Sequence, residues 1–387
     1  MKILTFSNCP LVESQGSGYV ILNYARGLAA RGHAVDLRGP ECFEPLRGIG
    51  LAKQHRQAVG LAFLAPLAAA FGDYDVVEFY GAESCLAASL LVRWPRRKFL
   101  LVSHSNGLET HADEETKKHF GHTTLDGLPP RLHQRFARLP FACAFRDVDA
   151  LVTVSEFDAA YARKAGYQDA SHTLALENPL AENYLGREAG TGRPQRIGYC
   201  GSWLAIKGAR LMEAAIPPVL EEFPRATFTL IGMDSGFRKE SHFPASICER
   251  IEVIPFLTDK DELRRVYETL SIVLQPSIYE SFGVVAAEAM ASGCALVATN
   301  TGFAASLRHL DEAFILKESS APMLHDALRI LLANDELRMR LARNGRRRVQ
   351  QLRWDGAVAR LESAYHRWLD ELRGRLKSQQ EGSFSHR

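Results

Sequence analysis

The stretch Pro276-Ser-Ile-Tyr-Glu-Ser-Phe-Gly-Val-Val-Ala-Ala-Glu-Ala-Met-Ala-Ser-Gly293 decides how this chain is interpreted. It places Glu280 and Glu288 eight residues apart, on either side of a small-residue helix start at 281–284. A helix N-terminus offers unpaired N–H groups and the positive end of the helix dipole, so it suits an anion such as a phosphate. Two carboxylates repel a phosphate, but they accept hydrogen bonds from hydroxyls that flank it. The stretch therefore indicates a ligand with hydroxyls on both sides of a diphosphate, which is the layout of a nucleotide sugar.

Glu288 carries the stronger part of this argument. The alternative is that one carboxylate complements the helix dipole while the other is solvated. However, Glu288 lies between Ala287 and Ala289, in a helix too apolar to be solvated. A carboxylate in such a place needs partners, so the sequence favours a ligand-binding role for the pair.

The composition is that of a globular protein. The chain has 387 residues, of which 46% are hydrophobic and 24% charged, and its formal net charge is +2. This length suits two domains better than one core, and the balanced charge gives no reason to expect nucleic acid as a partner. The seven cysteines are scattered, without a CxxC pair. This pattern favours reduced thiols in a cytoplasmic protein over a disulfide or zinc framework.

No segment is expected to direct secretion or to cross a membrane. The N-terminus, Met1–Ser7, has a strand pattern rather than that of a signal peptide. The longest apolar stretch, Leu61–Phe71, is shorter than the roughly 18 residues that a spanning helix needs. Basic residues gather at 93–98 and, interleaved with aromatic residues, at 131–146. They form either solvated helix faces or a peripheral docking surface for an anionic membrane or acceptor.

Strands and helices alternate along the chain, which predicts an α/β fold with parallel sheets. A helix is expected from Tyr19 to Arg31, after a glycine-containing loop. The strands expected in the first half are Lys2–Ser7, Ala34–Leu37, Asp75–Tyr80, Lys98–Ser103, Ala150–Ser155 and Thr173–Glu177. Those of the second half are Arg196–Cys200, Thr227–Ile231, Ile251–Pro255, Ile272–Gln275 and Ala295–Ala298. Two such series imply two units with a cleft between them, and open α/β sheets bind ligands at the carboxyl ends of their strands.

The boundaries follow from a polar stretch rich in glycine and proline at 181–195, which is the best linker candidate. We expect a first domain at 1–180 and a second at 196–354. A C-terminal helix is expected at 355–377, followed by a disordered tail at 378–387.

Two glycine-containing loops could approach a phosphate. In the second half, Gly201-Ser-Trp-Leu-Ala-Ile-Lys-Gly208 follows the first strand, and Lys207 stands before a helix. A lysine there places an ammonium against a phosphate, although it could simply be solvated. In the first half, Gly16 and Gly18 permit close approach to a ligand, or serve a tight turn. Because position 21 is Ile, GxGxxG is incomplete and a dinucleotide site is poorly supported.

Histidines offer weaker signals. His104 ends a predicted strand beside Ser, Asn and Gly, so it would face the cleft; the alternative is a core or solvated histidine. His111, His119 and His122 lie near acidic residues. No pair among them has tight ligand spacing on an evident element, so we expect no metal site.

Taken together, these residues resemble glycosyltransferase family four, the glycosyl transferases of group 1, which are retaining enzymes with the two-Rossmann-domain GT-B fold. The segment from Glu280 to Glu288 is similar to the E-x7-E motif of that family. The resemblance covers nearly the whole chain, and the order and spacing of the landmarks make it specific. The other landmarks are Gly16–Gly18, Ala25–Ala29, Arg31–Val35, Asp75–Val77, Ser103–His104, Val152–Glu156, Asn178–Pro179, Gly201–Gly208, Leu230–Gly232 and Trp354.

The resemblance implies two Rossmann-like domains facing across a cleft, with the donor bound in the second domain and the acceptor on the side of the first. The terminal helix would return toward the first domain. Glu288 would accept hydrogen bonds from the donor ribose, Glu280 would bind hydroxyls of the donor sugar, and Lys207 would neutralise the departing diphosphate. The other implied contacts are the backbone N–H groups of Phe282, Gly283 and Val284, the loop at Gly201, the close approach at Gly16 and Gly18, and His104 near the donor sugar.

Three positions depart from the family pattern. Ser202 stands where the family often has an arginine, so phosphate binding would rest on Lys207 or be compensated by Arg210 or Arg238. Ala295 replaces a usual proline, and residues 304–306 lack an acidic residue.

The implied reaction is transfer of a hexosyl unit from a nucleoside-diphosphate sugar, UDP- or GDP-linked, to a hydroxyl acceptor with retention at the anomeric carbon. It would need neither a metal nor a further cofactor. The acceptor would be a glycan, a lipid-linked molecule or a small molecule, and the oligomeric state is left open. The alternatives are an epimerase-like enzyme or a phosphorylase on the same fold, a non-catalytic nucleotide-sugar or glycan-binding relative, and a nicotinamide-dependent oxidoreductase, which the absent GxGxxG weakens.

Overall fold

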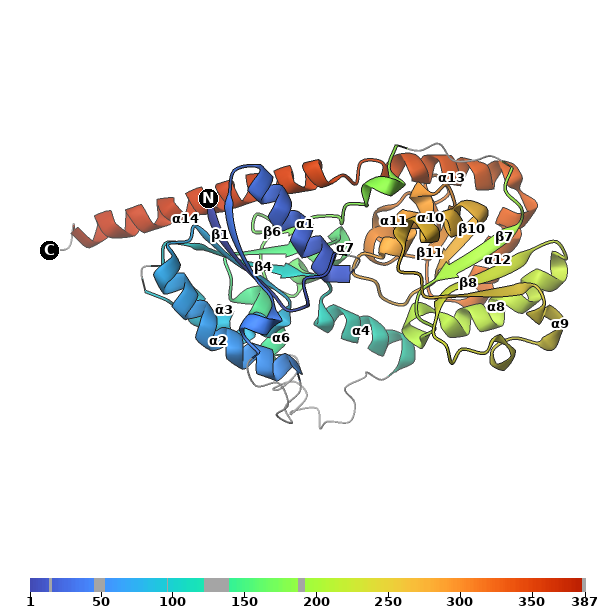
Figure 1. The fold of residues 1–387 in the computed structure, drawn as a ribbon, viewed down its shortest axis with the longest axis horizontal. Coiled ribbons are helices and arrows are strands. Elements are labelled where there is room, and N and C mark those ends of the chain that lie inside the picture. The colour runs from blue at the N-terminus through green and yellow to red at the C-terminus, as the bar shows by residue number, and fades with distance from the viewer. Residues whose placement is uncertain (14–15, 45–52, 96, 122–138, 187–191, 385–387) are drawn as a thin grey trace. The chain divides into compact units, whose positions relative to one another are not determined.

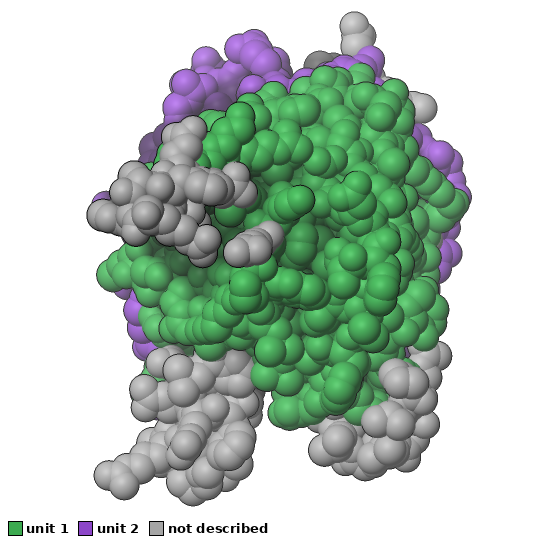
Figure 2. Space-filling model, turned by 90° about the vertical axis from the view of Figure 1, so that its left-hand side faces the viewer, with its two compact units in different colours: residues 1–117, 122–177, 354–387 green, residues 118–121, 178–353 purple. Residues whose placement is uncertain are grey.

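The structure is a computed structural model that describes residues 1–13, 16–44, 53–95, 97–121, 139–186 and 192–384. The chain forms two compact units, which Figure 2 colours separately. Unit 1 contains residues 1–117, 122–177 and 354–387, and unit 2 contains residues 118–121 and 178–353. The basic residues at 131–138 and His122 lie outside the described residues.

Unit 1 is built on a six-stranded parallel sheet with the order β2-β1-β3-β4-β5-β6. Its strands are β1 (Lys2–Ser7), β2 (Ala34–Arg38), β3 (Val76–Tyr80), β4 (Leu100–Ser105), β5 (Ala150–Thr153) and β6 (Thr173–Ala175). The helices of this half of the chain are α1 (Gly16–Ala30), α2 (Lys53–Gly72), α3 (Cys85–Val92), α4 (Glu109–Phe120), α6 (Leu139–Arg146) and α7 (Glu156–Lys164). Every residue of β3 and β4 is buried, as expected for parallel strands covered on both faces.

Unit 2 contains a second six-stranded parallel sheet, with the order β12-β11-β10-β7-β8-β9. Its strands are β7 (Arg196–Cys200), β8 (Thr227–Met233), β9 (Ile251–Pro255), β10 (Ile272–Gln275), β11 (Ala295–Thr299) and β12 (Phe314–Leu316). Its helices are α8 (Ala209–Glu222), α9 (Ala245–Cys248), α10 (Lys260–Thr269), α11 (Val284–Ala291), α12 (Ala321–Ala333) and α13 (Asp335–Val349). The chain builds outward from β7 to β9, then returns to β10 and builds the other way. The topological switch point therefore lies between β7 and β10, where open α/β sheets bind ligands.

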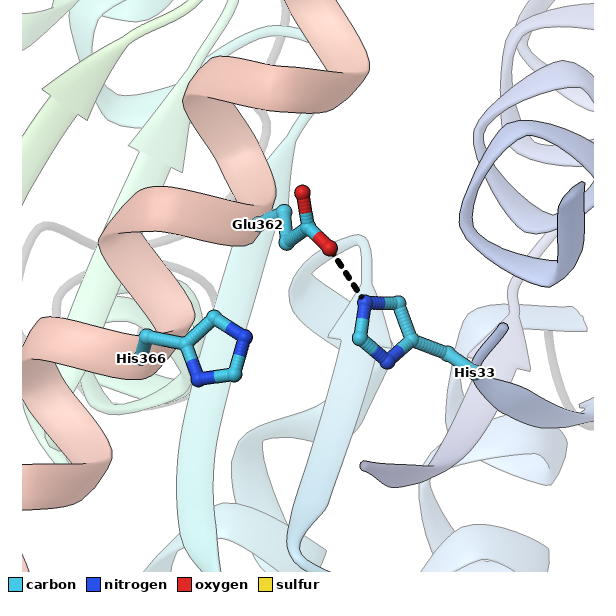
Figure 3. Close-up of side chains that lie close together, drawn as sticks. All are labelled: His33, Glu362 and His366. Atoms are coloured by element: carbon cyan, nitrogen blue, oxygen red, sulfur yellow. Dashed lines mark hydrogen bonds and ion pairs between the residues drawn. The ribbon is translucent and has the colours of Figure 1, made fainter. Parts of the chain in front are cut away.

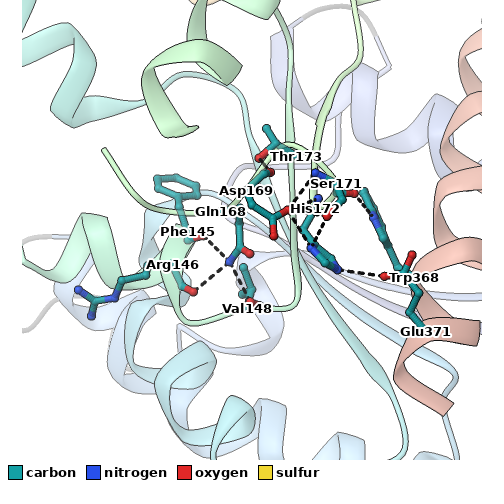
Figure 4. A network of polar contacts seen from close by, with 10 residues as sticks. All are labelled: Phe145, Arg146, Val148, Gln168, Asp169, Ser171, His172, Thr173, Trp368 and Glu371. Carbon is teal, nitrogen blue, oxygen red and sulfur yellow. Dashed lines mark hydrogen bonds and ion pairs between the residues drawn. The ribbon is translucent and has the colours of Figure 1, made fainter. Parts of the chain in front are cut away.

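The last helix, α14 (Trp354–Phe384), belongs to unit 1 and supplies part of its core. Trp368 is the largest fully buried side chain, and its indole nitrogen donates to the carbonyl oxygen of Ser171 at 2.8 Å. His172 contacts Glu371 of the same helix at 3.1 Å (Figure 4). Gln168 closes the other side of this loop by donating to the carbonyl oxygens of residues 145, 146 and 148. The helix thus fixes the segment that leads into β6.

The two parallel sheets confirm the α/β prediction, but several bounds differ. Helix α1 begins at Gly16 rather than Tyr19, and α14 continues to Phe384 instead of ending at residue 377. The apolar stretch at 61–71 lies inside α2, which accommodates Pro66. The sequence analysis did not predict β12.

Replacing Trp368 by Ala tests the role of α14. The change removes a fully buried indole, so we expect the free energy of unfolding to fall by about 3–5 kcal/mol. Urea unfolding followed by circular dichroism measures it. Arg375→Ala, an exposed change on the same helix, is the control and should stay within about 0.5 kcal/mol of the parent. Equal stability of the two variants would contradict a stabilising role for the buried face of this helix.

Candidate functional site

The switch point of unit 2 brings two loops together. The loop after β7 and the loop after β10 are joined by a backbone hydrogen bond from Ile278 to the carbonyl of Ile206, at 2.8 Å. Gly208 is in the left-handed region with φ 84°, and a Cβ there would lie 2.4 Å from the carbonyl oxygen of Pro276. Only glycine fits this approach, which holds the preceding Lys207 against the second loop.

Lys207 and Glu280 form an ion pair at this point, with 2.7 Å between Nζ and Oε1. The Ser277 hydroxyl donates to the same carboxylate oxygen at 2.8 Å. The backbone N–H of Glu280 donates to the Thr301 hydroxyl, from the loop after β11, at 2.9 Å. The lysine side chain is 35% exposed and the glutamate 13%, so the lysine has more freedom to turn toward a ligand.

Helix α11 starts beside this ion pair. Gly283 precedes it with φ 86°, and a Cβ there would lie 2.3 Å from Nε2 of the buried Gln275. Phe282 is buried, its ring centroid 5.2 Å from that of Phe303, and its carbonyl accepts the Phe303 N–H at 2.8 Å. The first turn, from Val284, has no acidic residue and no side-chain cap. The Ala286 N–H donates to the carbonyl of Gly283 at 3.0 Å, and the N–H groups of the residues before it, at the helix start, suit an anion.

Glu288 lies on the same helix and is only 4% exposed. Its Oε1 accepts from the Lys260 ammonium at 2.7 Å. Burial raises the pKa of Glu288, and the positive charge of Lys260 opposes that rise. A buried carboxylate with a single ammonium partner keeps free lone pairs, which hydroxyl donors could occupy.

Lys260 is the site residue that sequence reasoning missed. It begins α10, where the side chain of Asp259 caps the helix by accepting from the N–H of Asp261 at 2.8 Å. An aspartate at this position is a helix N-cap that the sequence could have indicated. The pairing of Lys260 with Glu288 could not be predicted from the sequence, because it depends on how α10 packs beside α11.

The arginines considered as substitutes at Ser202 do not join the ion pair. Arg238 is exposed and donates to the carbonyls of Ser235 and Phe237 in its own loop. Arg210 is exposed on α8. Within the described part of the chain, no hydrogen bond or ion pair links either arginine to Lys207 or Glu280. Lys260, rather than an arginine, supplies the second positive charge.

Gly16 and Gly18 lie within α1, whereas the sequence analysis placed them in a loop before that helix. Gly16 is the first residue of the helix, with φ 71°, and a Cβ there would have no heavy atom within 4 Å. At Gly18 a Cβ would lie 2.2 Å from the carbonyl oxygen of Pro10. The close approach at Gly18 is therefore to the protein's own chain.

His104 is buried inside unit 1, with 4% of its surface exposed. Its Nε2 lies 2.8 Å from the Tyr365 hydroxyl and 3.2 Å from Glu78, while the Tyr80 ring stacks on it at 4.2 Å between centroids. Tyr365 also donates to Glu78, which accepts from Thr5 as well. This environment favours the core-histidine alternative over a histidine that faces a ligand.

One group of described residues has ligand atoms close enough for a metal. His33, Glu362 and His366 lie within 4.8 Å of one another (Figure 3). The Glu362 carboxylate already binds His33 at 2.8 Å and Arg31 at 2.6 Å. The nearby guanidinium disfavours a dication, so we interpret the group as an ion-pair network that ties α14 to the segment before β2.

Two family models match the chain. The model described as "Glycosyl transferase 4-like domain" matches residues 15–178, and the model described as "Glycosyl transferases group 1" matches residues 188–348. The second match contains the two loops and α11.

Two curated relatives are similar over part of their length. The D-inositol 3-phosphate glycosyltransferase of Corynebacterium aurimucosum is 29% identical over 177 residues, covering 44% of this chain and 42% of the relative. The phosphatidyl-myo-inositol mannosyltransferase of Mycobacterium leprae is 28% identical over 163 residues, covering 41% and 42%. The match thus spans less than half the length of these relatives.

Two solved structures share the fold. Sucrose-phosphate synthase from Thermosynechococcus elongatus has a TM-score of 0.72 at 16% identity, covering 96% of this chain and 99% of that one. HepE from Anabaena, in complex with UDP, has a TM-score of 0.66 at 16% identity, covering 94% and 99%. At this identity the likeness establishes the fold alone.

Replacing Glu288 by Gln tests the buried charge. Because the pKa of Glu288 is raised in the folded protein, the native state holds this proton more tightly than the unfolded chain does. Its stabilising contribution is complete below the unfolded pKa and declines as the pH rises through the folded pKa. The free energy of unfolding of Glu288→Gln, minus that of the parent, should therefore increase as the pH rises from the unfolded pKa of a glutamate, about 4.3, through the raised pKa of the folded protein. Chemical denaturation at several pH values measures this difference. A difference independent of pH would contradict a pKa of Glu288 that is raised on folding.

Proposed function

Because the chain belongs to the glycosyl transferases of group 1, with their two-domain GT-B fold, we propose that it transfers a hexosyl unit from a nucleoside-diphosphate sugar to a hydroxyl acceptor. One observation carries the proposal: the Lys207–Glu280 ion pair lies at the open N-terminus of α11, one helix that also carries the buried Glu288. The ammonium and the helix dipole suit a diphosphate, and the two carboxylates suit the hydroxyls on its two sides.

Each glutamate has a separate role in this proposal. Glu288 accepts hydrogen bonds from the ribose hydroxyls. The positive charge of Lys260 opposes the effect of burial and favours the ionised carboxylate, which accepts hydrogen bonds and donates none. Glu280 exchanges its bond with Lys207 for hydroxyls of the donor sugar. The Lys207 ammonium then binds the diphosphate. In the absence of the donor, Lys207 and Glu280 satisfy each other's charge.

Catalysis in this proposal is mainly electrostatic. The bond between the anomeric carbon and the diphosphate oxygen breaks, and the acceptor oxygen forms the new bond on the same face. The acceptor proton passes to an oxygen of the leaving diphosphate. Lys207 and the first N–H groups of α11 stabilise the charge that develops on that leaving group. The anomeric configuration of the product, read by NMR, tests retention: an inverted product would exclude this course.

The donor and acceptor classes rest on the relatives. HepE was solved in complex with UDP, which supports a uridine diphosphate donor, and a guanosine diphosphate donor is the alternative. The curated relatives are named for inositol-containing acceptors. For this chain we propose the coarser class, a hydroxyl of a glycan, a lipid-linked molecule or a small polyol.

A second candidate is a non-catalytic relative that binds a nucleotide sugar. Ser202, in place of the arginine common in the family, favours it because one phosphate-binding charge is missing. The ion pairs of Lys207 with Glu280 and of Lys260 with Glu288 argue against it, since the site still holds a lysine to stabilise a leaving diphosphate and both glutamates.

Replacing Lys207 by Ala separates the two candidates. We expect kcat/KM for acceptor-dependent release of nucleoside diphosphate to fall by about 10²–10³, because the leaving group loses its cation. The assay uses purified protein with UDP- and GDP-linked sugars and candidate acceptors. Arg225→Ala, an exposed change elsewhere in unit 2, is the control and should leave the rate unchanged. Equal rates for the parent and Lys207→Ala would refute the assignment, and nucleotide-sugar binding without turnover would support the binding relative.

A further inference from the structure

An apolar surface of unit 1 takes no part in the proposed chemistry. Helices α2 and α3 lie beside each other, as Figure 1 shows. Their large exposed hydrophobic side chains, with the exposed fraction of each, are Val59 (41%), Phe63 (72%), Leu67 (57%), Phe71 (87%), Leu86 (47%) and Leu90 (55%). Trp94, the residue that follows the C-cap of α3, is 36% exposed. We call this set the α2–α3 face.

The spacing makes the face continuous. The four α2 members recur every fourth residue, and so do Leu86, Leu90 and Trp94, so each set follows one side of its helix. An open groove of about 550 Å³ runs between the two sets, lined by Phe63, Leu67, Leu90 and Trp94 among others. The opposite side of α2, including the buried Leu61 and Ala65, packs into the core. Single exposed hydrophobic residues need no explanation, but a contiguous face of this kind marks an interaction site.

The two segments that form the face carry basic residues and no acidic ones. Neither α2 nor residues 85–98 contain an Asp or Glu, whereas these segments hold six Lys or Arg residues. Arg56 is held by Glu44, and Arg97 by Asp149. Arg93, whose side chain is 67% exposed, makes a longer contact of 3.4 Å with Asp147, and Lys98 is exposed. The acidic residue that follows α2 is Asp73, which is exposed.

We propose that the α2–α3 face docks the protein on an anionic lipid bilayer. Phenylalanine, leucine and tryptophan on one side of a helix, with lysine and arginine nearby, are the residues that seat a helix in the headgroup region. Each Lys or Arg near such a surface adds attraction to anionic headgroups. A second copy of this chain fits less well, because a symmetric contact through this face would bring the same basic residues opposite each other.

This inference is independent of the proposed chemistry, since none of the residues of the face lies in unit 2. It also gives the basic cluster at 93–98 a role beside a hydrophobic surface, which sequence reasoning had left open. Among the described residues no helix is long and apolar enough to span a membrane, so the proposed contact is peripheral.

The test is flotation of the purified full chain with vesicles of phosphatidylcholine alone and of equal parts phosphatidylcholine and phosphatidylglycerol. We expect flotation with the anionic vesicles, weakened by high salt because the lysine and arginine charges are screened. Phe63→Ser with Phe71→Ser should lower the partition coefficient by roughly tenfold or more, since each phenylalanine contributes its full apolar burial. Arg93→Glu with Lys98→Glu should weaken binding to the anionic vesicles.

Ile330→Ser is the matched control, because Ile330 is 42% exposed on α12 in unit 2. It should float like the parent. All substituted residues are exposed, and unchanged circular dichroism and thermal midpoints verify that the variants fold. The proposal is overturned if the parent does not float, or if the double-serine variant floats as well as the parent. It is also overturned if light scattering shows a dimer that the double-serine variant loses.

Discussion

The carboxylate of Glu288, buried in the apolar helix α11, is the constraint on which unit 2 depends. A charged group at 4% exposure is costly unless it is paired. Lys260 pairs with it, and this requires α10 to begin beside α11. Helix α11 also starts at the switch point between β7 and β10, where Lys207 and Glu280 form their ion pair. Glu288 therefore lies on α11 and Glu280 just before it, and each carboxylate binds one lysine from another part of unit 2.

Two glycines allow the loops of the site to lie close together. At Gly208 and Gly283 a Cβ would lie 2.4 Å from Pro276 and 2.3 Å from Gln275, so a side chain would push the two loops apart. Both residues also have positive φ, which other residues adopt only with strain. The ion pair therefore rests on backbone geometry rather than on the packing of large side chains. This suits a site in which a ligand must replace one protein contact with another.

Much of the fold was predictable because parallel strands buried on both faces are written as apolar runs, as in Lys2–Ser7 and Ile272–Gln275. The sequence placed Lys207 and Glu280 in loops after two strands of the same predicted sheet, but it did not predict that the two side chains form an ion pair. The Lys260–Glu288 pair was not predicted either, because it depends on the packing of two helices. The position of His104 at a strand end predicted that its side chain would face a cleft. In the structure Tyr365, which is 261 residues away in the sequence, contacts the His104 ring inside unit 1. The role of Gly18 likewise depends on Pro10, whose position the sequence does not reveal.

Hydrogen exchange of the full chain, with and without saturating UDP or GDP, tests most directly whether the donor binds at the switch point. The account predicts that at least one of the two nucleotides slows exchange at residues 201–208 and 276–284, and that Glu288→Ala abolishes this protection. Protection confined to unit 1, or unchanged exchange at both loops with a nucleotide that demonstrably binds, would contradict it.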